Sequence, residues 1–266
     1  MRKLILLFVL LCGMYSCTQV ITIDLNSTAP KLVVEGTVTN HPGPDTISLS
    51  MTTNYFAPVG VNPLAGAAVY ISDNAGNFDT LRQISPGKYL THTTVGVIGR
   101  TYYLTVAANG QKYTAFSTMP DTVGIDSMSS AERVPRFGSS GLPSFSITCS
   151  FTDPAFAGHY YGFRLYHNGI LLDNIIDNRV IDDKLIVGTA QHVKFRNSAL
   201  LVGDSVRVDL VCMDKAGYDF FNTLKETLTS GSPFSAPPAN PITNLSNGAI
   251  GYFGAQSYKS KTIQLQ

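Results

Sequence analysis

The residue types that could carry out catalysis are present in this chain, but their spacing matches no catalytic motif. A hydrolase nucleophile elbow needs Gly-x-Ser-x-Gly between a strand and a helix, and a phosphate-binding loop needs Gly-x-x-x-x-Gly-Lys followed by Ser or Thr. Neither pattern occurs. Segment 138–141 reads Gly-Ser-Ser-Gly, which lacks the spacing and a following helix. We therefore expect no catalytic residues and a protein that is not an enzyme.

The histidines and carboxylates do not predict a metal centre or a glycosidase. The five histidines are scattered, and none has a partner at the spacing of metal ligands. A glycosidase needs two well-placed carboxylates. Aspartates that could supply them are Asp153, Asp173, Asp177, Asp182 and Asp183. Because Asp is also a common turn former, we interpret these residues mostly as turns and expect no metal and no cofactor.

The clearest chemical signal lies at the N-terminus. Two basic residues precede the apolar run 4–12, which is shorter than the roughly 20 residues of a membrane-spanning helix and is typical of a secretory signal. Ser16 then precedes Cys17, as in bacterial lipoproteins, where a peptidase cuts before the cysteine and its thiol receives diacylglycerol. We predict a signal peptide over 1–16, lipid attachment at Cys17 and a lipidated tether over 17–30. An ordinary signal peptide with an incidental cysteine is the alternative.

Two further cysteines, Cys149 and Cys212, fall on the apolar faces of alternating segments. Both thiols should therefore point into one core. A disulfide is one outcome in an oxidising envelope. Two unpaired buried thiols are the other, because a free cysteine packs as a small hydrophobic residue.

Aromatic residues in loops are the leading candidates for ligand binding. They lie in a long loop of the first half, in a Gly-Ser loop and in a Pro-rich loop. They are Tyr55, Phe56, Phe137 and Phe234, and Arg136 beside Phe137 is a further candidate. Such residues often form sugar or peptide sites. In the alternative interpretation each side chain folds back and covers one end of a β-sandwich.

One short pattern recurs: Asp, then Ser or Thr, then an apolar residue. It resembles the O-glycosylation acceptor of Bacteroidota envelope proteins. The hydroxyl residues in these positions are Thr46, Thr80, Thr122, Ser127 and Ser205. The alternative is structural, with Asp ending a turn and the next residue starting a strand.

Composition predicts a mainly β protein. Charged residues make up 14% of the 266 residues, against about 25% in an average domain. Only three residues are Glu, while strand-favouring Thr, Tyr, Val and Ile are plentiful. A helical bundle and a coiled coil are therefore excluded. The net charge of +1 gives no reason to expect nucleic acid as a partner.

Turn signals at regular spacing divide the chain into two predicted domains. Segment 31–118 has about seven short strands and is typical of an immunoglobulin-like or transthyretin-like β-sandwich. The residue pattern of segment 119–266 predicts a second β-rich domain with one helix near 215–229. We expect it to close with two strands, at 249–254 and 257–264.

Several segments in a fixed order resemble one family. They include Pro30 to Gly36, Gly66 to Asp73, Ser85 to Tyr89 and Gly251 to Ala255. Together they are similar to DUF4249, a domain-of-unknown-function family of Bacteroidota outer-membrane lipoproteins. The resemblance implies an outer-membrane lipoprotein, often encoded beside a TonB-dependent receptor, and it implies no catalytic residues.

The expected function is a lipid-anchored binding or accessory module for a TonB-dependent transporter in nutrient uptake, with a glycan or peptide as ligand. The alternative is an envelope structural or adhesion protein without a transport partner. The face of the outer membrane on which the protein lies stays open.

Overall fold

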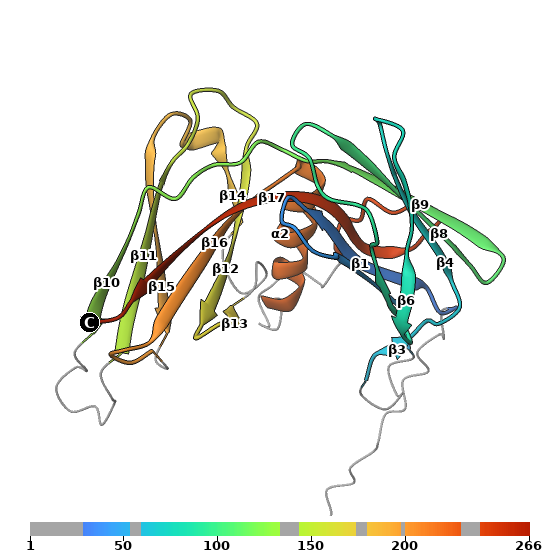
Figure 1. Cartoon of the computed structure of the whole chain (residues 1–266), viewed down its shortest axis with the longest axis horizontal. Helices are drawn as coiled ribbons and strands as arrows, with labels where there is room; N and C mark the ends of the chain where they lie inside the picture. Colours follow the sequence, from blue (N-terminus) through green and yellow to red (C-terminus); the bar gives the residue numbers. More distant parts are fainter. Residues whose placement is uncertain (1–28, 54–59, 134–143, 174–179, 198–199, 230–239) are drawn as a thin grey trace, which may run out of the picture.

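The computed structural model of the chain describes residues 29–53, 60–133, 144–173, 180–197, 200–229 and 240–266 (Figure 1). Strands make up most of the described residues, and one α-helix accompanies them, so the prediction of a mainly β protein is confirmed. No helix among these residues is long and apolar enough to cross a membrane.

The first half of the chain contains nine strands in the described ranges. They are β1 (Leu32–Thr39), β2 (Thr46–Met51), β3 (Asn62–Pro63), β4 (Ala68–Asp73), β5 (Phe78–Thr80), β6 (Arg82–Ser85), β7 (Lys88–Leu90), β8 (Thr101–Ala108) and β9 (Gln111–Thr118).

The second half contains the remaining strands, one short 3₁₀ helix and the α-helix. They are β10 (Ser127–Arg133), β11 (Ser144–Thr152), β12 (Tyr160–His167), β13 (Ile170–Asp173), β14 (Ile181–Asp182), η1 (Asp183–Leu185), β15 (Ala190–Asn197), β16 (Ser205–Met213), α2 (Lys215–Thr229) and β17 (Ile250–Gln264). The predicted helix at 215–229 coincides with α2.

Two sheets enclose the core of the first body, which we define as β1 to β9 with the first half of β17. One sheet has the order β17-β1-β2-β7-β6, and the other has the order β5-β4-β8-β9. Alternate residues of the longer strands β1, β2, β4, β8 and β9 point inward, and side chains such as Val34, Ile47 and Leu104 are fully buried. The same alternation of apolar and polar residues in the sequence predicts these strands.

The second body, β10 to β16 with the second half of β17, repeats the layered plan. Strands β13-β12-β16-β17 form one layer, and β10-β11-β15 form the other. Phe151, Phe163 and Leu210 are among the fully buried side chains between these layers.

The last strand joins the two bodies. Residues 250–256 of β17 pair in parallel with β1, and residues 257–264 pair antiparallel with β16. The red ribbon of β17 therefore runs from one body into the other, and one sheet of ten strands passes through both (Figure 1). The expectation of two closing strands was wrong, because a single 15-residue strand covers 250–264.

Helix α2 lies between the two bodies (Figure 1). Asp214 begins it by accepting a hydrogen bond from the backbone N–H of Gly217 at 2.9 Å. The ring of Phe220 stacks on that of Tyr252 in β17, with centroids 5.4 Å apart. The helix thus packs on the strand that both bodies share.

Candidate functional site

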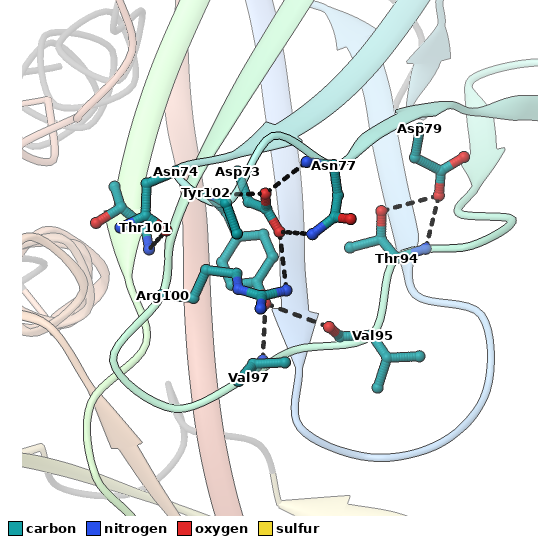
Figure 2. Close-up of polar contacts among 11 residues, drawn as sticks. Asp73, Asn74, Asn77, Asp79, Thr94, Val95, Val97, Arg100, Thr101 and Tyr102 are labelled. Carbon is teal, nitrogen blue, oxygen red and sulfur yellow. Dashed lines mark hydrogen bonds and ion pairs between the residues drawn. The ribbon is translucent and has the colours of Figure 1, made fainter.

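A hollow of about 360 Å³ lies at one end of the first body. The turn between β4 and β5 forms one wall, and the 92–100 loop, which leads into β8, forms the other (Figure 2). Its lining mixes polar side chains such as Asp73, Asn77 and Arg100 with apolar ones such as Val95 and Val97.

The start of the 92–100 loop is fixed by Asp79, a buried carboxylate of β5. Its Oδ2 accepts hydrogen bonds from the backbone N–H groups of His92, Thr93 and Thr94 and from the Thr94 hydroxyl, each at 2.9 Å. Burial alone would raise the pKa of Asp79, but these four hydrogen bonds outweigh it and hold the pKa below its usual value. The carboxylate is therefore charged at neutral pH and holds the backbone in place.

The middle of the loop is fixed by Tyr102 and Gly96. The Tyr102 hydroxyl accepts a hydrogen bond from Val97 N–H at 2.7 Å and donates one to Val95 C=O at 3.2 Å. Gly96 N–H donates to Thr39 C=O at 2.8 Å. A Cβ at Gly96 would lie 2.4 Å from that oxygen, so no other residue fits this position without a shift.

These contacts direct three apolar side chains outward. Val95, Val97 and Ile98 are 49%, 44% and 44% exposed. They form an apolar rim on a backbone that is already ordered, so little conformational entropy would be lost when a partner covers them.

The polar floor of the hollow is an ion pair. Arg100 Nη1 lies 3.0 Å from Asp73 Oδ2 (Figure 2). Asp73 also accepts hydrogen bonds from Asn77 and from the backbone N–H of Ala75. Burial works against its ionisation, but these bonds and the Arg100 charge lower its pKa. The hollow thus combines an ion pair without net charge and an apolar rim.

The strongest candidate for metal binding is a buried cluster in the second body. One ligand atom each of Asp153, His159 and Asp183 lies within 4.8 Å of the others. Asp183 Oδ2 already accepts hydrogen bonds from the N–H groups of Gly158 and His159. Asp153 Oδ1 accepts one from Tyr161. The cluster therefore has hydrogen-bond partners of its own and ties neighbouring loops together.

Six of the predicted site residues lie outside the described residues. They are Cys17, Tyr55, Phe56, Arg136, Phe137 and Phe234. The lipid attachment and the loop-aromatic interpretation therefore stay predictions.

Cys149 and Cys212 are both buried and both free. Of the two alternatives that the sequence left open, the structure has unpaired thiols. Burial raises the pKa of Cys149 to about 12 and that of Cys212 to about 11. The sulfurs are thus protonated at neutral pH and pack as hydrophobic side chains in the core of the second body.

The five predicted O-glycosylation positions differ in exposure. Thr46, Thr80 and Ser127 are exposed, whereas Thr122 and Ser205 are partly buried. Strands β2, β10 and β16 begin at the hydroxyl residue that follows Asp45, Asp126 and Asp204. The structural interpretation therefore applies at these three sites, and glycosylation stays a prediction.

Only a weak signal in the sequence marks the 92–100 loop. Val95 and Val97 flank Gly96, which resembles the pattern of a buried strand. The side chains point outward because Gly96, rather than either valine, packs against β1. The partners that hold the loop, Asp79 and Tyr102, are distant in sequence.

Fold and site together define a mainly β protein of two layered bodies, with an apolar rim on a loop that is held by hydrogen bonds. The chain belongs to the family described as Domain of unknown function (DUF4249), whose profile matches residues 18–262. A search of the curated proteins gives no match to the chain.

Proposed function

We propose that this protein is a lipid-anchored, non-catalytic accessory module of the outer membrane that works with a TonB-dependent transporter in nutrient uptake. The signal peptide and the lipidated Cys17 expected from the sequence would supply the anchor. The partner comes from the family resemblance. The alternative, an envelope structural or adhesion protein, shares the anchor and lacks the transporter.

The observation that carries the proposal is the 92–100 loop. The backbone N–H of Gly96 donates a hydrogen bond to Thr39, the last residue of β1. The tether expected over 17–30 precedes Leu32, the first residue of the same strand. An eight-residue strand is about 26 Å long. The rigid apolar rim thus lies at the end of β1 opposite the tether, where a neighbouring membrane protein could cover it.

A pull-down from the native outer membrane tests this proposal. The tagged, lipidated protein is extracted in mild detergent beside a Val97→Asp/Ile98→Asp variant. Val202→Asp serves as the control, because Val202 is exposed by 71% and lies in the second body. We expect one TonB-dependent receptor in near-equal amount with the wild type and the control, and at least tenfold less with the double variant.

Two results would count against the proposal. If the wild type comes down alone, the transporter role fails and the structural or adhesion alternative takes its place. If the receptor comes down equally with the double variant, the loop is not the contact surface.

A further inference from the structure

The outer face of sheet β5-β4-β8-β9 carries a regular arrangement of aromatic rings and hydroxyls. The inner face of these strands is buried against the core. Strand register places the outward residues in rows that cross the sheet. One row is Phe78, Ser72, Tyr103 and Phe116, and the next row is Thr80, Tyr70, Thr105 and Thr114.

The aromatic rings of this face are open to solvent. Phe78, Tyr103 and Phe116 are 64%, 44% and 65% exposed. They form two pairs: Tyr70 with Phe78, at 5.5 Å between centroids, and Tyr103 with Phe116, at 6.4 Å. Adjacent strands lie about 4.8 Å apart, so the row from Phe78 to Phe116 spans about 14 Å. The small side chain of Ser72 separates the two pairs.

The remaining outward positions are hydroxyls and small residues. Threonines surround the rings, at positions 80, 101, 105, 114 and 118. Lys112 is the one charged side chain among the outward positions of these four strands. Asp73 and Asp79 belong to the alternate, inward set, and their hydrogen-bond partners are described above. The face is therefore apolar and hydroxyl-rich, with almost no charge.

A hollow borders the face on each side. Phe78 lines the 360 Å³ hollow at the 92–100 loop. Tyr103 and Phe116 line another of about 520 Å³, which is closed by residues 243–246 beside β9. A hollow therefore lies at each end of the row from Phe78 to Phe116, so the surface is longer than a single small molecule requires.

We propose that this face binds a neutral oligosaccharide chain, with sugar rings stacked on the two aromatic pairs. A pyranose has an apolar face of C–H groups and a rim of hydroxyls, which matches rings surrounded by threonine hydroxyls. A face with almost no charge offers no partner to an anionic chain. The inference rests on the proposed accessory role and names its ligand class.

Affinity electrophoresis in gels that each contain one soluble polysaccharide tests the inference on the mature full-length protein. The neutral probes are xyloglucan, glucomannan, arabinoxylan, mixed-linkage β-glucan and dextran, and alginate is the anionic probe. We expect at least one neutral polysaccharide to retard the protein and alginate to have no effect. Each ring lost by Phe78→Ala, Tyr103→Ala or Phe116→Ala should weaken binding about two- to tenfold.

Two variants serve as controls. Tyr103→Phe keeps the stacking ring and should bind nearly as the wild type does, which separates stacking from a folding defect. Phe156→Ala removes a ring that is 61% exposed in the second body and should leave retardation unchanged. Circular dichroism melting of each variant confirms that it is folded.

The inference is overturned if no neutral polysaccharide retards the protein, if alginate alone does so, or if the three alanine variants bind as the wild type does. It is also overturned if light scattering shows a dimer that Phe116→Ala dissociates, because a second copy then covers the face. A receptor pull-down with the Phe116→Ala variant distinguishes the two proposals. If this variant still brings down the receptor but does not bind a glycan, the proposed accessory role is unaffected.

Discussion

Asp79 and Asp45 are both carboxylates that accept hydrogen bonds from backbone amides, yet their pKa values move in opposite directions. Asp79 has four donors, three of them backbone N–H groups, and its pKa is lowered. Asp45 has two, the N–H and hydroxyl of Thr39. Its burial outweighs both bonds and the nearby charge of Arg164, and raises its pKa to about 6. At Asp79 the hydrogen bonds outweigh the effect of burial on the pKa, whereas at Asp45 they do not.

The raised pKa of Asp45 predicts a pH dependence of stability. Between its ordinary value of 3.8 and about 6, the folded protein binds a proton that the unfolded chain has released. The contribution of Asp45 to the free energy of unfolding therefore falls as pH rises through this window and is constant above it. Asp45→Asn, which still bonds Thr39, should be more stable than the wild type at pH 7, and the difference should shrink toward pH 4.

Urea unfolding of both proteins at several pH values between 4 and 7.5 measures this difference. Other titrating groups are common to the two proteins and cancel. A difference that stays flat across the window would show that Asp45 is not the group responsible.

In helix α2, tertiary contacts at Gly217 matter more than the low helix propensity of glycine. Replacing Gly by Ala in a helix interior usually stabilises it by about 1 kcal/mol. At Gly217, however, a Cβ would lie 2.5 Å from the Tyr252 hydroxyl and 3.3 Å from the Met213 Cβ. We predict that Gly217→Ala lowers the free energy of unfolding by about 1–3 kcal/mol, through overpacking.

The matched control for this prediction is the double variant Gly217→Ala/Tyr252→Phe. Removing the hydroxyl relieves the closest contact, so chemical denaturation should show part of the loss restored. If Gly217→Ala alone were stabilising, the helix would have to shift away from β17 without cost.

The elements also show what the sequence could predict. Alternation located most strands and the 3.6-residue period located α2, because each has one buried face. Strand β17 does not show alternation in its middle, because residues 252–257 are all buried, with the first body and α2 on its two sides. One long strand is therefore not predictable there. The aromatic face is not predictable from alternation for the opposite reason: Phe78 and Phe116 are apolar residues on the solvent side, and alternation assigns apolar residues to the core.

At the scale of the whole molecule, the shared strand makes the first body dependent on the end of the chain. The core of that body includes Leu245, Ala249, Phe253 and Ala255, and β1 would have an open edge without residues 250–256. An unpaired edge and a missing part of the core are both destabilising. The segment 31–118, predicted as a domain from turn spacing, thus contains all its own turns but lacks part of its core.

Two fragments test this dependence. We predict that residues 29–118 alone do not fold, and that residues 29–118 joined by a short Gly-Ser linker to residues 240–256 do. The linker can be short because the Asn244 side chain donates a hydrogen bond to Phe116 C=O, near the end of β9. Amide NMR spectra and circular dichroism melting compare the two, and dispersed amide signals from 29–118 alone would contradict the prediction. Folding of the joined fragment would mean that the first body is a folding unit of its own once residues 240–256 complete its core and cover the edge of β1.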